Sequence, residues 1–149
     1  MVLWYIGLSV LIVANVFRSS GVDYRLIAVK SGGETIPTGE MKLGSIIGDH
    51  VRTGLGVLLD CGTTVRPFAT ILPTGRLAPR DVPAFTRVGP DGVQPVEDVD
   101  GALRSSAIAM SRRGKDLTPA LAALYRTIAG SVDVQSLPMR PPFELRKSA

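Results

Sequence analysis

A six-residue repeat runs through the middle of this 149-residue chain. Counted from position 41, every sixth residue is apolar except Thr53, and the residue four positions further on is always small or β-branched. This period is neither the 3.6 of a helix nor the 2 of a plain strand, and it is typical of a β-helix, in which short strands stack coil upon coil. Even offsets in extended chain share a face, so both series should point into the core. The two series are Met41, Ile47, Thr53, Leu59, Val65 and Ile71, and Ser45, Val51, Val57, Thr63, Ala69 and Gly75. An ordinary β-rich domain that matches the period by chance is the alternative.

Residues 1–17 carry no charge, and three interpretations of them stay open. Two further hexads begin at Ile6 and Ile12, which favours additional β-helix coils. A membrane-spanning helix needs about 20 apolar residues, which makes this run short. A signal peptide would have a positive n-region, and none precedes the apolar run. If the β-helix interpretation holds, the chain starts inside a solenoid without a polar cap, as the C-terminal portion of a longer protein would.

The residues that fill the hexads, and not only their period, resemble those of a known protein family. The stretch Lys42-Leu-Gly-Ser-Ile-Ile-Gly-Asp49, with the hexads that follow it, resembles the left-handed β-helix of bifunctional sugar-1-phosphate nucleotidyltransferase/acetyltransferases, the family of UDP-N-acetylglucosamine pyrophosphorylase/glucosamine-1-phosphate acetyltransferase. The resemblance covers about residues 6–85. It implies a left-handed parallel β-helix and a homotrimer with sites between subunits. We expect a cytoplasmic location, since a single cysteine suits a reducing compartment. It also implies a sugar phosphate or nucleotide sugar as substrate and acetyl-CoA as co-substrate, with no resident cofactor.

Turn and capping residues divide the chain further. Gly32-Gly33 predicts a β-hairpin inside an excursion from the coil, and Pro90-Asp91-Gly92 predicts another turn. Asp98 or Asp100 and the pair Thr118-Pro119 predict the starts of two helices. We expect these helices to form a hairpin that caps the open end of the β-helix. The expected parts are coils over 1–76 with the excursion at about 18–40, an extended linker with a β-turn over 77–97, a helical hairpin over 98–130, and an extended or disordered tail over 131–149.

His50 is the only histidine, and its place in the hexad points its side chain outward. Acetylation of an amine needs a general base with a pKa near 7. In the resembled family the catalytic histidine belongs to an earlier coil, which this chain lacks. We therefore expect His50 to be structural rather than catalytic.

The resemblance also implies binding residues. Asp23, Tyr24 and Arg25 in the polar excursion and Lys42 after it would contact the sugar phosphate, although the family's Asn-Tyr-Asp-Gly loop is not preserved around Asp23 and Tyr24. An acyl-CoA groove on the solenoid would be lined by Thr53, Gly54 and Arg66.

Composition narrows the function classes. The single cysteine, Cys61, excludes an intramolecular disulfide and indicates a small structural thiol. One histidine and one cysteine offer no metal-ligand spacing, so we expect no metal. The net charge of +4 is not clustered and aromatic residues are 5%, which excludes a base-stacking nucleic-acid platform. The leading hypothesis is the C-terminal portion of a sugar-phosphate nucleotidyltransferase/acyltransferase-like protein, inactive alone. The alternatives are a non-catalytic β-helix oligomerisation module and a single-pass membrane protein anchored by residues 1–17.

Overall fold

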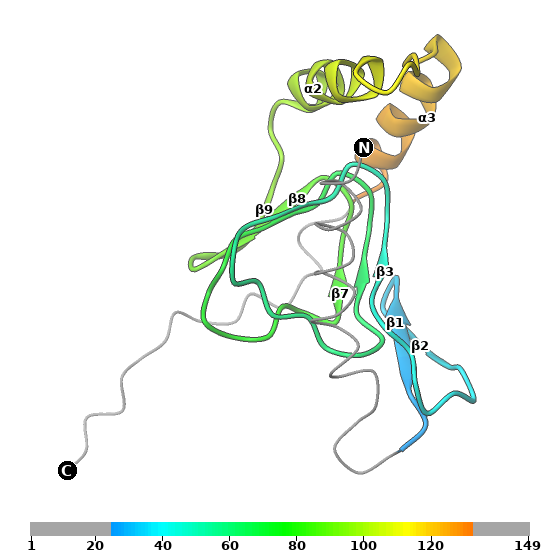
Figure 1. Ribbon diagram of the computed structural model, residues 1–149, viewed down its shortest axis with the longest axis vertical. Coiled ribbons are helices and arrows are strands. Elements are labelled where there is room, and N and C mark those ends of the chain that lie inside the picture. The colour runs from blue at the N-terminus through cyan, green and yellow to red at the C-terminus, as the bar shows by residue number, and fades with distance from the viewer. Residues whose placement is uncertain (1–24, 133–149) are drawn as a thin grey trace, which may run out of the picture.

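The computed structural model describes residues 25–132, and it begins with the predicted hairpin (Figure 1). Strands β1 (Ala28–Ser31) and β2 (Glu34–Pro37) pair antiparallel, and the turn between them consists of Gly32 and Gly33. Both glycines have positive φ, at 65° and 85°, as a two-residue hairpin turn of this kind requires. The expectations for residues 1–17, and for the tail beyond residue 132, lie outside the described residues.

Most of the remaining strands lie in two sheets that are built mainly from parallel pairs. The first sheet has the order β3-β5-β7, and the second has the order β4-β6-β8-β9, in which β9 runs antiparallel to its neighbour. Consecutive strands along the chain alternate between the two sheets up to β8. The bounds are β3 Ile46–Ile47, β4 Arg52–Thr53, β5 Thr64–Val65, β6 Thr70–Ile71, β7 Asp81–Val82, β8 Thr86–Gly89 and β9 Gly92–Pro95.

The pairing register shows that the chain returns to the same sheet after about three hexads. Ile46 pairs with Thr64, which lies three full hexads later in the chain. Thr64 pairs with Asp81, and this separation in sequence is one residue shorter. The second sheet has the same two steps, and a parallel bridge between Leu58 and Leu77 forms on a third side. Figure 1 shows the resulting triangular path of the chain. The fold is therefore β-rich, with short parallel strands stacked on one another.

The structure corrects the expectation of a linker over 77–97. Strands β7 and β8 fall in this range and pair in parallel with β5 and β6, so the segment extends both sheets. Pro79 and Pro83 flank β7 without occupying its paired positions, and so they remove no ladder hydrogen bond. The predicted turn is confirmed, because β8 and β9 form a hairpin that closes at Gly89 and Gly92.

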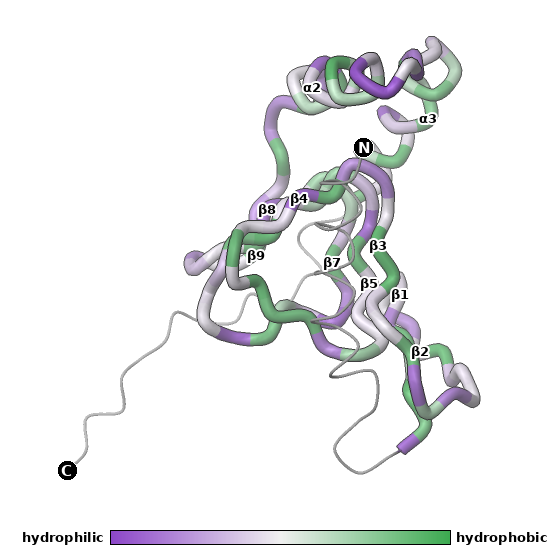
Figure 2. Tube along the Cα trace, in the orientation of Figure 1, coloured by the Kyte–Doolittle hydropathy of each residue, from purple (hydrophilic) through white to green (hydrophobic). Residues whose placement is uncertain are grey.

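The hexad frame correctly predicted much of the core inside the coil. The buried cluster there contains three residues of the predicted apolar series and Ala69 of the small series. Its members are Leu59, Val65, Ala69, Ile71, Val82 and Val88. Figure 2 shows hydrophobic and hydrophilic stretches alternating around this path.

The frame fails at its two ends. Met41 and Ile47 are 53% and 39% exposed, and both belong to the first described coil, where β3 pairs with β5 on one side only. Gly75 is exposed as well. The predicted inward positions are therefore buried in the middle of the series and not at its two ends.

Two helices form a second layer at one corner of the coil. Helix α2 (Val99–Ser111) is capped by Asp98, and α3 (Pro119–Gly130) is capped by Thr118, which confirms both predicted starts. Their apolar faces pack against Phe68, Ala84 and Phe85 in a separate buried cluster. The helices therefore lie beside a corner that runs along the stack, and the expectation that they cap its open end was wrong (Figure 1).

Candidate functional site

One corner of the triangle carries an aromatic residue in each successive turn of the chain. His50, Phe68 and Phe85 follow β3, β5 and β7, and their spacing repeats the two steps of the strand register. All three have positive φ, at 57°, 61° and 49°, a conformation that bulky L-residues rarely adopt. This backbone turns the chain from the first sheet into the second at every level.

The aromatic rings of this corner stack along the coil. The Phe68 and Phe85 rings are parallel to within 8°, with their centroids 4.5 Å apart, and the His50 ring lies 4.9 Å from Phe68. Offset-stacked aromatic pairs contribute about 0.5–1.5 kcal/mol beyond their burial. The stacking therefore offsets part of the conformational cost of the three left-handed residues. We call His50, Phe68 and Phe85 the corner ladder.

Tyr125 of α3 closes over the corner ladder. Its ring meets Phe68 edge-on at 4.8 Å and His50 edge-on at 5.8 Å. Its hydroxyl donates to the Asp49 carboxylate at 3.2 Å. Burial first, and then the neighbouring Asp49, raise the pKa of Tyr125. The phenol therefore stays protonated at neutral pH and keeps its role as a donor.

His50 is held as a neutral ring in this environment. Burial is the main cause that lowers its pKa, Arg52 and Arg113 lower it further, and Asp49 opposes them. A neutral imidazole is the form that accepts a proton, but this ring packs against Phe68 and Tyr125. The packing agrees with the expectation that His50 is structural, and its lack of a catalytic role stays a prediction.

The hairpin separates the residues predicted to bind phosphate from Arg66. Arg25 and Lys42 lie at the open end of the hairpin, because the Ile27 amide donates to the Glu40 carbonyl. The Arg66 guanidinium lies near the turn at the other end, since its Nη2 would be 3.6 Å from a Cβ on Gly32. Arg66 is also paired with both oxygens of Asp81 at 3.1 Å. Asp23 and Tyr24 lie outside the described residues.

Thr53 and Gly54, predicted to line an acyl-CoA groove with Arg66, lie in the other sheet. Thr53 pairs with the buried Ile71 and so faces the coil interior. The Gly54 amide donates to the Ile71 carbonyl at 2.8 Å. A Cβ on Gly54 would meet the ring of Pro73 at 2.7 Å, so glycine is required there for close packing. The candidate groove and phosphate residues are therefore not brought together within the described chain.

Cys61 occupies a buried position beside charged groups. Burial and the neighbouring Asp60 raise its pKa, so the thiol stays protonated. Arg80 donates to the Cys61 carbonyl at 2.8 Å and lies 3.9 Å from Asp60. These contacts tie two successive turns together and agree with the interpretation of Cys61 as a structural thiol.

Other candidate sites in the described part of the chain are few. A shallow open hollow of about 320 Å³ lies between α2 and α3, beside the ion pair of Arg126 with Asp100. Residues 25–132 contain no cluster of three His, Cys, Asp or Glu side chains placed to hold a metal ion. Neither described helix is long and apolar enough to cross a membrane.

Part of the chain is similar in sequence to a known protein. No family model matches the chain. A bifunctional sugar-1-phosphate nucleotidylyltransferase/acetyltransferase from Sulfurisphaera tokodaii is 40% identical to it over 60 residues. The matched segment is 40% of this chain and only 15% of that protein's length. The comparison therefore supports a distant relation to such transferases.

Sequence reasoning missed the corner ladder and its partner Tyr125. The available signal was that His50, Phe68 and Phe85 recur at a spacing close to three hexads. These three residues lie at a corner outside the hexad series, so the periodicity of the apolar interior positions does not reveal them. The hydrogen bond that Tyr125 of α3 donates to Asp49 beside this corner joins residues 76 positions apart, so it has no local signal in the sequence.

Proposed function

We propose that this chain forms a left-handed hexapeptide-repeat β-helix of the sugar-1-phosphate nucleotidyltransferase/acetyltransferase type. The observation that carries the proposal is the parallel register, in which strands about three hexads apart pair around a three-sided path. This register agrees with one hexad for each side of a triangular coil. The 40% identity to a bifunctional transferase over 60 residues supports the same assignment.

The proposed role of this domain is to present a sugar phosphate or nucleotide sugar, with acetyl-CoA as the second substrate. The chain alone does not catalyse acetyl transfer at a useful rate, because it does not supply the general base. A base must reach the attacking amine at about 2.6–3.2 Å, and the only histidine is packed in the corner ladder. The candidate groups for phosphate and acyl-CoA lie apart in one chain, so a complete cleft would combine surfaces of neighbouring subunits.

An acetyl-transfer assay of the purified protein tests whether the chain supplies the general base. Glucosamine-1-phosphate and acetyl-CoA are supplied, free CoA is measured, and the His50→Ala variant is assayed beside the wild type. We expect no CoA release above the protein-free rate in either, since loss of a general base alone typically slows a reaction by about 10²–10⁴-fold. Turnover in the wild type that disappears in His50→Ala would show that His50 is the base and would contradict the structural assignment.

A second candidate function is oligomerisation without catalysis. Leu55, Leu58 and Leu77 are 97%, 49% and 43% exposed, and the last two are neighbours in the parallel bridge on the third side of the coil. Contiguous exposed apolar residues are typical of protein–protein contact surfaces. A β-helix that only holds subunits together would bind neither substrate, whereas the first candidate would bind a sugar phosphate.

A further inference from the structure

A row of polar side chains crosses the outer face of the β4-β6-β8-β9 sheet. Arg52 pairs with Thr70, Thr70 with Arg87, and Arg87 with Gln94, so the four residues are in line across four strands. Side chains alternate between the two faces along a strand. On β4, β6 and β8, the residue that follows the member of the row faces the coil interior. On β9, the residue that precedes Gln94 does so. These inward residues are Thr53, Ile71, Val88 and Val93.

The spacing of the row suits a ligand with several anionic oxygens. Neighbouring strands are about 4.8 Å apart, which places the Cα atoms of Arg52 and Arg87 about 10 Å from each other. Two extended arginine side chains cover this separation, with the Thr70 hydroxyl between them. A guanidinium offers a planar fork of N–H donors that matches phosphate oxygens in bidentate fashion. Gln94 adds an amide donor at the end of the row.

The two arginines of the row are available to a ligand. Ion pairs among residues 25–132 involve Arg66, Arg80, Arg104 and Arg126, and neither Arg52 nor Arg87 belongs to them. Both side chains are exposed. Two cations so close together repel one another, and an anionic ligand would relieve that repulsion.

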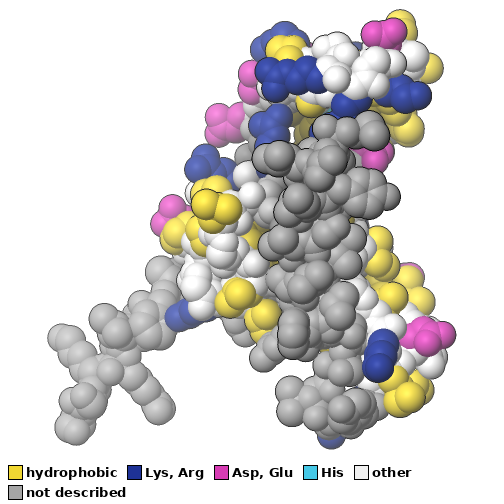
Figure 3. All heavy atoms as spheres, viewed as in Figure 1, with side chains coloured by type: hydrophobic (Ala, Val, Ile, Leu, Met, Phe, Trp, Pro, Cys, Tyr) yellow, Lys and Arg dark blue, Asp and Glu magenta, His cyan; other side chains and the backbone are white. Residues whose placement is uncertain are grey.

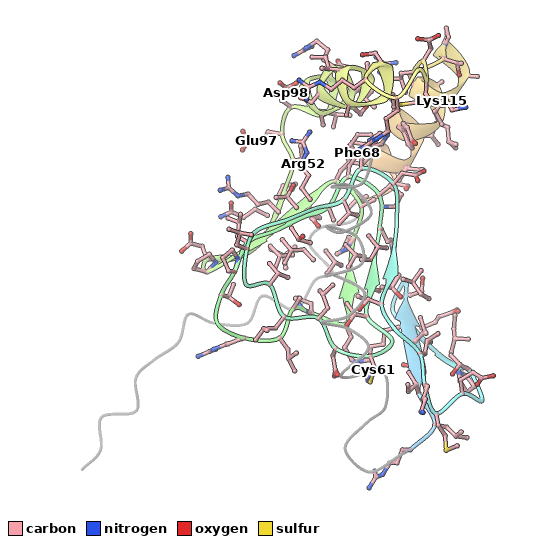
Figure 4. All side chains as sticks on the ribbon, viewed as in Figure 1. Arg52, Cys61, Phe68, Glu97, Asp98 and Lys115 are labelled. Carbon is pink, nitrogen blue, oxygen red and sulfur yellow. The ribbon has the colours of Figure 1, made fainter. Side chains whose placement is uncertain are left out.

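Further positive charge lies next to the row. Arg52 and Arg113 both act on the corner residue His50, so the end of the α2 segment brings a second cation toward the same corner. Figure 4 shows Arg52 directed outward from the coil, in the region below α2. In Figure 3, Lys and Arg side chains lie over α2 and the adjacent part of the coil, with Asp and Glu side chains among them. Glu97 and Asp98 lie on the segment before α2, so the positive charge that would attract an anion comes from the row itself and from Arg113.

We propose that Arg52, Thr70, Arg87 and Gln94 form a binding site for a phosphoryl group, with the two arginines holding its oxygens and Thr70 donating between them. The proposal deepens the function proposed above and rests on it for the ligand class, a sugar phosphate or a nucleotide sugar. The row lies on the outside of the coil, where a ligand reaches it without entering the core.

The test is a titration of the ¹⁵N-labelled protein with two probes at constant ionic strength, inorganic pyrophosphate and glucosamine-1-phosphate. We expect amide shifts concentrated at residues 52, 70, 87 and 94 with both probes. Arg52→Gln and Arg87→Gln should each weaken binding about tenfold or more, since a hydrogen bond to a charged group contributes that much. Lys30→Gln is the matched control, because it removes one exposed cation from the hairpin, in a different sheet.

The possible outcomes distinguish failure of the proposed phosphoryl site from failure of the proposed function. Equal affinity of the arginine variants and the wild type, or an equal loss in Lys30→Gln, would overturn the site. Shifts in the wild type that map away from the row would overturn it even if an arginine variant failed to fold. Row-dependent binding of pyrophosphate without binding of glucosamine-1-phosphate would support the phosphoryl site and contradict the sugar-phosphate function.

Discussion

His50, Phe68 and Phe85 each adopt a backbone conformation that costs free energy for any residue except glycine. Glycine at these corners would remove the strain, but it would also remove the rings that stack on one another and receive Tyr125. The sequence therefore keeps aromatic side chains where backbone preference alone would favour glycine. The last of the three, Phe85, is also fixed by its amide, which donates to the Pro67 carbonyl at 3.0 Å.

Titration of His50 should make the free energy of unfolding depend on pH. Its pKa is lowered in the folded protein, chiefly by burial, so the unfolded chain takes up the proton first as the pH falls. The stabilisation is present above the unfolded pKa of about 6.5 and is lost as the pH falls through the lower folded value. Urea unfolding followed by circular dichroism between pH 7.5 and pH 5.5 should show this loss.

The matched control for this prediction is His50→Gln, which cannot titrate. His50 is the only histidine, so no other side chain with an ordinary pKa in this window contributes. The variant should show a flatter dependence on pH above about pH 6 than the wild type. Parallel curves for the two proteins would contradict burial of His50 as a neutral ring.

At the scale of elements, Tyr125 joins α3 to the coil by two aromatic contacts and one hydrogen bond. Tyr125 is 4% exposed and supplies both, through its ring to Phe68 and His50 and through its hydroxyl to Asp49. Leu121 and Ile128 pack around it from the same helix. The position of α3 therefore depends strongly on this one side chain.

Tyr125→Phe should keep the ring contacts and lose the bond to Asp49. We expect the free energy of unfolding to fall by about 1 kcal/mol, the usual net contribution of a hydrogen bond. Asp49→Ala, which removes the acceptor, and the double variant complete a double-mutant cycle in chemical denaturation. The double variant should be little worse than either single one, and fully additive losses would contradict a direct interaction between the two groups.

Elements with strong local signals were predictable from sequence. Gly32-Gly33 determined the hairpin turn through its backbone freedom, and Asp98 and Thr118 determined the helix starts through capping. The strand β7 was missed because two prolines surround it and the step to it is one position short of three hexads. The row from Arg52 to Gln94 was also missed, because it exists only once the register between four strands is known.

The whole molecule combines a coil, a hairpin against one side of it, and two helices along one corner. The third side of the coil, where Leu58 and Leu77 pair, carries exposed leucines. Closed symmetric assembly is the common way for soluble chains to bury such a surface. The expected homotrimer stays a prediction at this scale.

Light scattering coupled to size-exclusion chromatography should give three times the chain mass of 15.8 kDa. Leu58→Asp places a charge on the exposed third side and should shift the protein to monomer. Leu124→Asp is the control, because Leu124 has a similar exposure of 53% but lies on α3. A monomeric wild type, or a trimer that survives Leu58→Asp unchanged, would contradict assembly through this side.

The number of residues between paired positions differs from one side of the coil to another, and this shows where the chain can change its length. Thr70 follows Arg52 by three full hexads, whereas the step from Leu58 to Leu77 is one position longer and the step from Thr64 to Asp81 is one position shorter. The segments between the sides therefore absorb differences of one or two residues while the paired strands keep their alternation. One extra residue within a strand would instead exchange its inner and outer faces. Duplication of a whole turn would preserve every face and lengthen the stack by about 4.8 Å. Growth by complete turns, with small edits confined to the corners, is the route by which such a chain can diverge in size without losing its core.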